Sequence, residues 1–397
     1  MAGAWLTPCA GFFPVFSMKV SSMKMSGSKF LVVVSMSIAF GIANLCAHAD
    51  AAAQAAPIPE PSIDQRIAFY SQKLQQHPTL FVVYTQLAAA YLDKAREDLD
   101  PQWLKLAEQN LEQSLKIYAN FDAYKGLEVL NAYRHRFAEA RRWGELAYKI
   151  APDDYEVLAV LVEADLGLND IDTAIKRLPP LDSEPQQFHI AVAMANVYKA
   201  KHQYAEARKL FLIAEQFAAT QGYPYLELWS RTNAAGMLID SGHAKEARPD
   251  LEAATKMHKG DSILRLHWSE YHEGIGEPEK ALSIMESMLE DANHPSYHYR
   301  AYKLSKKLGY AEKAKAHYAA AEKGYLLPLK QGEIYSLGSL ALLYCAADTH
   351  LDKALELAQR NLTFKRDDEA QNALKCVQEK LSAKNKKKVP SSAKAKA

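Results

Sequence analysis

FHIAVAMANVYKAKHQYAEARKLFLIAEQ, residues 188–216, is the stretch that decides the fold. Its apolar and small side chains recur every three or four residues on both sides of a short polar turn, which is the spacing of two amphipathic helices. Ala195 on the first predicted helix and Ala207 on the second leave room for a close backbone approach, and Phe211 fills the space beside them. One such hairpin cannot bury both of its faces, so the stretch predicts an array of stacked hairpins.

The small residue of the second helix recurs along the chain at steps of 33, 34, 33, 40, 34, 33 and 40 residues. The series is Ala107, Ala140, Ala174, Ala207, Ala247, Ala281, Ala314 and Ala354. A second position follows four residues after each alanine and a third follows three residues later, so that each second helix carries an i, i+4, i+7 stripe. Eight matches in nearly constant register predict eight repeats.

This register resembles the tetratricopeptide-repeat family, whose unit is a helix–turn–helix of 34 residues. The resemblance covers roughly residues 78–381 and includes the family's first-helix and terminal-proline positions: Tyr84, Leu87, Ala88, Tyr91 and Pro152. Gly144 departs from the pattern because the family has a large apolar residue there. The resemblance implies an all-α fold, an α-solenoid of about eight repeats over residues 62–381, with capping helices at 62–76 and 367–381.

The N-terminal segment, residues 1–49, has the features of a secretory signal peptide. It contains no Asp or Glu, has lysines before an apolar run at residues 30–45, and ends in Ala47-His48-Ala49. The run is shorter than the roughly 20 residues that span a membrane as a helix. We therefore expect cleavage and a periplasmic or secreted bacterial protein, with no membrane span after cleavage; an uncleaved membrane anchor and an organelle transit peptide are the alternatives. An Ala/Pro-rich linker follows at residues 50–61.

The C-terminal segment, residues 382–397, is rich in lysine and contains no acid, so we expect a disordered tail. The whole chain has 48 basic and 47 acidic residues. Without the three lysines of the signal and the six of the tail, 39 basic residues face 47 acidic ones, so the repeat body is acidic. The tail is interpreted as solubilising; weak contact with anionic surfaces and folding back onto the acidic body are the alternatives.

Two cysteines, Cys345 and Cys376, remain after signal removal. Both fall on predicted helices that could pack together. We expect two buried free thiols, and the alternative is a disulfide formed in an oxidising compartment.

Chemistry-bearing motifs are nearly absent. Gly274 and Gly276 begin like a nucleotide-binding loop, but Glu279 takes the place of the third glycine. His267 and Glu270 share a helix face, which is fewer than the three or four converging ligands of a metal site. The sequence therefore predicts no catalytic residues, no cofactor, no metal site and no specific nucleic-acid partner; we expect a protein that is not an enzyme.

The family resemblance implies that first helices line a concave groove that holds a partner peptide or helix. Carried onto this chain, its groove positions are Asp122, Lys125, Tyr133, Glu163, His189, Asn196, Lys199, Trp229, Thr232, Glu270, Tyr299, Lys303, Lys306 and Lys307. The lining would be acidic in the middle and basic at Lys303–Lys307. We also expect an insertion before Ala107 to lengthen a turn and expose Trp103.

These features favour an exported, non-catalytic protein–protein interaction scaffold. Two alternatives remain: an accessory subunit of an envelope enzyme or secretion complex, and a surface protein attached through its basic tail.

Overall fold

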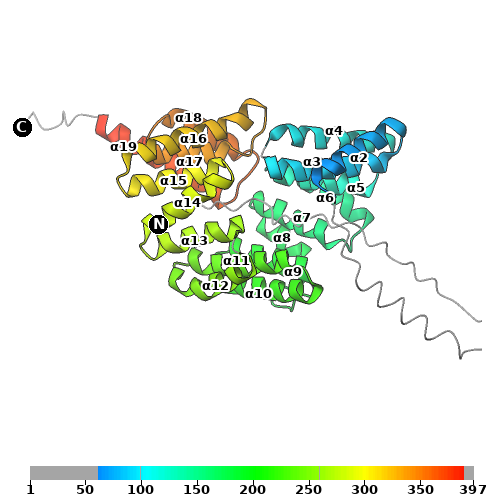
Figure 1. The fold of residues 1–397 in the computed structure, drawn as a ribbon, viewed down its shortest axis with the longest axis horizontal. Helices are drawn as coiled ribbons and strands as arrows, with labels where there is room; N and C mark the ends of the chain where they lie inside the picture. The colour runs from blue at the N-terminus through cyan, green and yellow to red at the C-terminus, as the bar shows by residue number, and fades with distance from the viewer. Residues whose placement is uncertain (1–60, 99, 259, 389–397) are drawn as a thin grey trace, which may run out of the picture.

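The computed structural model describes residues 61–98, 100–258 and 260–388, and all the regular secondary structure in these ranges is helical (Figure 1). A leading helix, α2 (Ile63–Gln76), is followed by eight helical hairpins and a last helix, α19 (Asp368–Lys388). The hairpins are α3 (Phe81–Asp98) with α4 (Pro101–Ile117), α5 (Phe121–Tyr133) with α6 (Phe137–Ile150), α7 (Tyr155–Gly167) with α8 (Ile171–Arg177), α9 (Phe188–Ala200) with α10 (Tyr204–Gln221), α11 (Pro224–Asp240) with η1 (Ala244–Ala247) and α12 (Arg248–Met257), α13 (Ser262–Gly274) with α14 (Pro278–Asp291), α15 (Pro295–Lys307) with α16 (Ala311–Lys330), and α17 (Leu337–Ala347) with α18 (Leu351–Asn361). The predicted α-solenoid is confirmed.

The eight alanines of the series lie at the closest contacts of the hairpins. Seven of them are completely buried, and Ala314 is 8% exposed. The methyl side chain lets neighbouring backbones approach, and larger apolar residues such as Phe211 and Leu251 fill the space around the contact. The buried residues form several clusters along the array instead of one central core, as stacked repeats require.

The three insertions lengthen helices. α10 has 18 residues and α16 has 20, which accounts for the two 40-residue steps. The insertion before Ala107 was expected to lengthen a turn and expose Trp103, and this expectation is wrong. It extends α3 to Asp98, and Trp103 is half-buried because its ring stacks on Tyr91 at 5.7 Å between centroids.

A buried carboxyl group accounts for the departure at Gly144. Glu128 on α5 is completely buried, and neither of its carboxyl oxygens has a hydrogen-bond partner. A β-carbon on Gly144 would lie 2.3 Å from Oε1 of Glu128. The glycine therefore provides the space that this carboxyl group occupies. Burial raises the pKa of Glu128 well above its ordinary value, which favours the neutral acid.

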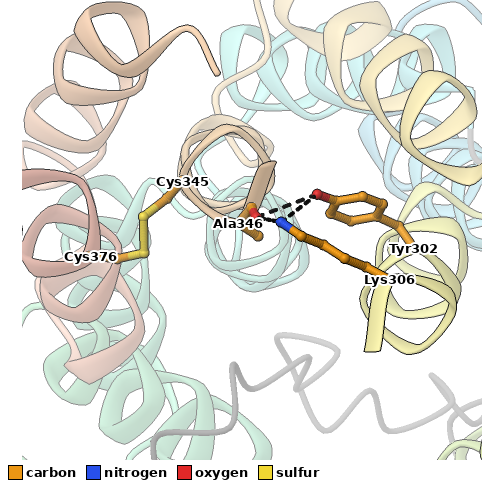
Figure 2. Close-up of a disulfide and its surroundings, with 5 residues drawn as sticks. All are labelled: Tyr302, Lys306, Cys345, Ala346 and Cys376. Carbon is orange, nitrogen blue, oxygen red and sulfur yellow. Dashed lines mark hydrogen bonds between the residues drawn. A yellow bond between two sulfur atoms is a disulfide. The ribbon is translucent and has the colours of Figure 1, made fainter. Parts of the chain in front are cut away.

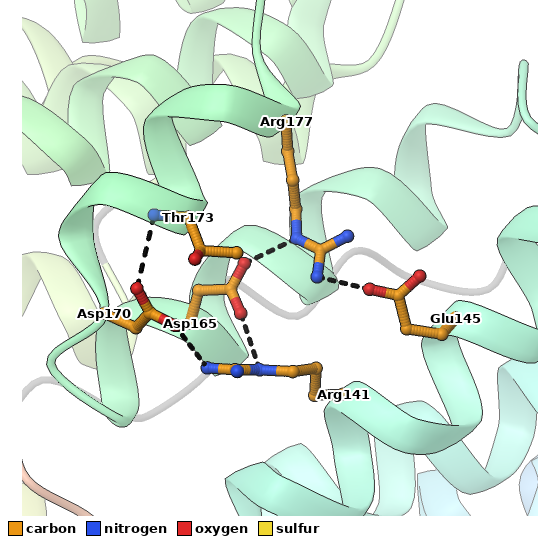
Figure 3. Close-up of polar contacts among 6 residues, drawn as sticks. All are labelled: Arg141, Glu145, Asp165, Asp170, Thr173 and Arg177. Carbon is orange, nitrogen blue, oxygen red and sulfur yellow. Dashed lines mark hydrogen bonds and ion pairs between the residues drawn. The ribbon is translucent and has the colours of Figure 1, made fainter.

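An ion-pair network fixes the short helix α8 against its neighbours (Figure 3). Asp165 at the end of α7 is fully buried and lies between Arg177 of α8 and Arg141 of α6, 2.7 Å from Nε of Arg141. Arg177 also reaches Glu145, and Arg141 reaches Asp170, the N-cap of α8. The network therefore joins three consecutive helices and holds the α7–α8 turn in place.

Six of the turns inside the hairpins share one backbone position with a left-handed conformation. Glycine occupies it in three later hairpins, at Gly242, Gly276 and Gly309. In three earlier hairpins the position is held by His135, Asn169 and His202, with φ of 57°, 58° and 57°. Residues with a β-carbon rarely adopt this conformation because it crowds the following carbonyl group.

The array curves until its C-terminal part meets its N-terminal half (Figure 1). Two segments make this contact: residues 331–336, between α16 and α17, and residues 365–369, at the start of α19. We call them the clasp. In the first segment, Glu333 pairs with Arg134 at 3.0 Å and the ring of Tyr335 lies 6.2 Å from that of Tyr133. The second segment reaches the α7–α8 and α9–α10 turns.

The C-terminal hairpin is joined to the last helix by a disulfide between Cys345 of α17 and Cys376 of α19 (Figure 2). The expectation of two free thiols is therefore wrong, because packing brings the two α-carbons to 6.3 Å, within bonding reach. α19 continues to Lys388, beyond the predicted end of the repeat body at Leu381, since lysine and alanine favour helix. The predicted signal peptide lies outside the described residues, as does the predicted linker except Pro61. None of the described helices is long and apolar enough to span a membrane.

Candidate partner-binding cavity

The curved array surrounds a central cavity of about 1580 Å³ that is partly open to solvent. First helices of consecutive hairpins form one side of it, with Glu163 from α7, Asn196 from α9 and Trp229 from α11. The clasp and α16 form the other side, with Tyr335, Asp368 and Tyr325. The cavity is thus the concave surface of the solenoid, closed along one side by the C-terminal part of the chain.

Six of the fourteen predicted groove residues line this cavity. They are Tyr133, Glu163, Asn196, Lys199, Trp229 and Glu270. They come from five consecutive first helices, α5 to α13, which the fold brings around one space. Their part in partner binding stays a prediction.

Lys125 and His189 lie away from the cavity lining and contact a neighbouring repeat. Lys125 pairs with Asp154 at 2.9 Å and with Glu156 at 2.6 Å. His189 lies 3.8 Å from Glu156, and burial lowers its pKa. Asp122 and Thr232 also do not line the cavity, and Thr232 is buried with its hydroxyl donating to the Leu228 carbonyl.

The predicted basic end of the groove is engaged in contacts within the protein. Tyr299 is a core residue, only 5% exposed, and the ammonium group of Lys303 lies 5.6 Å from its ring centre. Lys306 donates to the carbonyl oxygen of Ala346, near the end of α17, at 2.6 Å (Figure 2). Lys307 lies 3.7 Å from Glu273. These four residues do not line the cavity.

Charged groups on α11, α13 and α15 control the electrostatics of one cavity wall. Glu270 pairs with Arg300 at 2.7 Å and with His267 at 2.6 Å. Burial alone would raise the pKa of Glu270, but Arg300 and His267 outweigh it and lower the pKa to about 2. Burial raises the pKa of Asp240 to about 8, because it outweighs the opposite effect of Lys199 and Arg300. One carboxyl group is therefore firmly ionised at neutral pH, and the other is largely protonated.

Acidic side chains outnumber basic ones in the lining of the cavity. Ten carboxyl-bearing residues line it: Glu97, Asp100, Glu163, Asp240, Glu270, Asp291, Glu322, Asp367, Asp368 and Glu369. Four lysines or arginines accompany them: Arg96, Lys199, Lys323 and Lys330. The acidic excess persists even with Asp240 neutral, so the field in the cavity favours a cationic occupant.

Sequence reasoning missed the wall that the C-terminal part contributes. Tyr325, Ser336 and Asp368 belong to the last two hairpins and α19, which lie far from α5 and α7 in the chain. No local pattern marks them, because they reach the cavity only through the curvature of the whole array. Within the part of the chain that the structure describes, no three His, Cys, Asp or Glu side chains are arranged to hold a metal ion.

No family model matches this chain. Among curated proteins, the cellulose synthase operon protein C of Xanthomonas axonopodis pv. citri (strain 306) is 24% identical over 158 residues. That match covers 39% of this chain and only 10% of the relative. The chain therefore matches about one tenth of the relative's length.

Solved structures similar to this chain include the following two. A tetratricopeptide repeat protein from Parabacteroides merdae ATCC 43184 is 11% identical, with a TM-score of 0.40 over 65% of this chain and 98% of that chain. A human IFIT1 dimer with m7Gppp-AAAA is 14% identical, with a TM-score of 0.45 over 76% of this chain and 77% of that chain. The fold assignment itself rests on the eight hairpins described above.

Proposed function

We propose that this protein is a non-catalytic protein–protein interaction scaffold, exported to the cell envelope or beyond it, that holds a peptide or helix of its partner in the central cavity. The observation that carries the proposal is the cavity itself, about 1580 Å³ and lined by first helices of successive hairpins. Its volume exceeds the roughly 300–1,000 Å³ of sites for small ligands. A polypeptide segment is therefore a better match in size than a small molecule.

The lining also suggests the chemistry of the partner. Acidic residues outnumber lysines and arginines, and the aromatic rings of Tyr133, Tyr225 and Trp229 lie among them. Cations pair with carboxylates and with aromatic faces, so a lysine- or arginine-bearing segment suits this surface. The phosphates of a nucleic acid would be repelled by the same carboxylates, which disfavours a nucleic-acid partner.

Two features support export. The N-terminal pattern is that of a signal peptide, and the bond between Cys345 and Cys376 is of a kind that persists in oxidising compartments outside the cytosol. Mass spectrometry of the native protein tests this part: we expect a mature N-terminus near Asp50, and retention of residues 30–45 would contradict cleavage.

A second candidate is an accessory subunit of an envelope polysaccharide-synthesis assembly. The observation that favours it is the similarity of 158 residues to a cellulose synthase operon protein C. In that case the partner would be another subunit of such an assembly. If the crosslinking experiment described next recovers a subunit of an envelope polysaccharide synthase, this candidate is favoured.

Site-specific photo-crosslinking in the native organism tests the cavity as the binding surface. A photoreactive phenylalanine analogue replaces Tyr225, which lines the cavity and is 46% exposed. The matched control replaces Tyr310, which is 44% exposed and does not line the cavity. We expect a discrete crosslinked protein only from position 225. A crosslink only from position 310 would place the partner on the outer surface and refute the proposal.

A further inference from the structure

The clasp contacts the inner turns of three successive hairpins in the N-terminal half. On the α5–α6 turn, burial and the nearby Lys365 lower the pKa of His135 well below its ordinary value. On the α7–α8 turn, the carbonyl oxygen of Gly167 accepts a hydrogen bond from the backbone N–H of Arg366 at 2.7 Å. On the α9–α10 turn, His202 pairs with Asp368 at 3.1 Å.

These three turns are the ones that carry His135, Asn169 and His202 in the left-handed conformation. Three later turns have glycine at the equivalent position, and the α17–α18 turn has Asp348 and His350 in the left-handed conformation. Glycine adopts this conformation without steric cost, whereas histidine and asparagine adopt it less readily than glycine, although more often than other residues with a β-carbon. Non-glycine residues in this conformation are retained where the surrounding structure holds them, and contact with the clasp is a feature that these three turns share.

Arg134 anchors the other half of the closure. Its side chain is only 2% exposed and is held by Glu108 of α4 at 2.8 Å, within the N-terminal half. Its remaining partner, Glu333, comes from the clasp at 3.0 Å, with a side chain 7% exposed. Tyr335 packs beside it against the apolar cluster of the first two hairpins. Arg134 keeps one carboxylate partner if the clasp leaves, so release does not strand a buried charge.

We propose that the clasp is a conformational closure: it fastens the solenoid on itself, and its release widens the central cavity to admit or free a partner. Turns and side chains form this contact, so the array can open without breaking any hairpin. Each repeat contacts chiefly its neighbours, and a small rotation at each interface then adds up along the array. The part of this inference that concerns entry and release of a partner rests on the proposed function.

Distance measurement between spin labels tests the closure in the absence of any partner. Labels are placed on cysteines at Lys105 of α4 and Lys315 of α16, both exposed, in the full chain with Cys9→Ser and Cys46→Ser and with the native disulfide kept. The unaltered clasp should give one narrow distance distribution. The clasp variant with Glu333→Ala, Tyr335→Ala and Asp368→Ala should shift it to longer and broader distances, while the circular-dichroism spectrum stays that of folded helices.

Two sets of turn variants show whether the three unusual turns serve the closure. The first set replaces the strained residues: His135→Gly, Asn169→Gly and His202→Gly. The matched set introduces strain outside the clasp: Gly242→Asn, Gly276→Asn and Gly309→Asn. We expect the first set to broaden the distance distribution, and the second to lower the melting temperature while leaving the distances unchanged.

Unchanged distances in both the clasp variant and the first turn set would overturn the proposal. A broad distribution in the protein with the unaltered clasp would overturn it as well. No partner is present in these distance measurements, so a result that refutes the closure would not contradict the scaffold proposal. Absence of a crosslink at position 225 would refute the scaffold proposal and would not bear on the closure.

Discussion

Replacing Gly144 by alanine should destabilise the protein, and the cause should be Glu128. The added β-carbon would lie 2.3 Å from Oε1 and 2.8 Å from Cδ of Glu128, and 2.7 Å from Cδ2 of Leu161. Distances below 3 Å between such atoms require a displacement. All three residues are buried, so neighbouring side chains must move to make room.

Two opposing terms set the size of the effect. Alanine is favoured over glycine inside a helix by about 1 kcal/mol. Overpacking a filled interior costs about 1–3 kcal/mol. The net loss for Gly144→Ala should therefore be about 0–2 kcal/mol. Glu128→Ala removes the carboxyl group and leaves space into which the Leu161 side chain can shift, so in that background Gly144→Ala should become stabilising by up to about 1 kcal/mol. The coupling energy between the two positions is then about 1–3 kcal/mol.

A double-mutant cycle measured by urea unfolding at pH 7 tests this reasoning. The four proteins are the unchanged chain, Gly144→Ala, Glu128→Ala and the double variant. The control cycle pairs Gly144→Ala with Glu139→Ala, an exposed residue on the same helix, and should be additive. If the Glu128 cycle is also additive to within about 0.5 kcal/mol, the carboxyl group is not what requires a glycine here.

Three further predictions concern packing, pH and the disulfide. Ala207→Trp places a large ring at a completely buried helix contact and should lower the free energy of unfolding by at least about 1–3 kcal/mol; an unchanged melting temperature would contradict the repeat geometry. Arg300 and His267 hold the folded pKa of Glu270 at about 2, below its ordinary 4.5. The stabilisation by this carboxylate should therefore be present above pH 4.5 and lost as the pH falls through about 2, by about 3 kcal/mol in all. Glu270→Gln should flatten the dependence of the unfolding free energy on pH over that range, and a dependence equal to that of the unchanged chain would refute the assignment. Cys345 and Cys376 are 31 residues apart, and loop-closure entropy predicts that the double variant Cys345→Ser, Cys376→Ser loses about 3–4 kcal/mol of unfolding free energy. The urea midpoint should fall accordingly, and a reducing agent should cause the same fall in the unchanged chain.

The sequence by itself determined the repeat. The alanine series requires close backbone contacts at a fixed period, and such contacts form between neighbours in the chain, so a local pattern was enough to predict all eight hairpins. The same reasoning flagged Gly144 as an exception, but the reason lay in the side chain of Glu128 on another helix. Only the tertiary packing could show that a buried carboxyl group occupies the space.

The tertiary structure decided which surfaces meet across the array. The family resemblance predicted a groove that included Tyr299 and Lys306, but packing places Tyr299 in the core and pairs Lys306 with the end of α17. Six predicted residues, Glu163 and Trp229 among them, do line the cavity because they lie on the first helices of adjacent repeats. The clasp contact could not be predicted from the sequence, because it depends on small rotations at every repeat interface that add up along the chain. The sum of these rotations brings Glu333 to Arg134 and closes the array, and no single repeat carries a sequence pattern that predicts it.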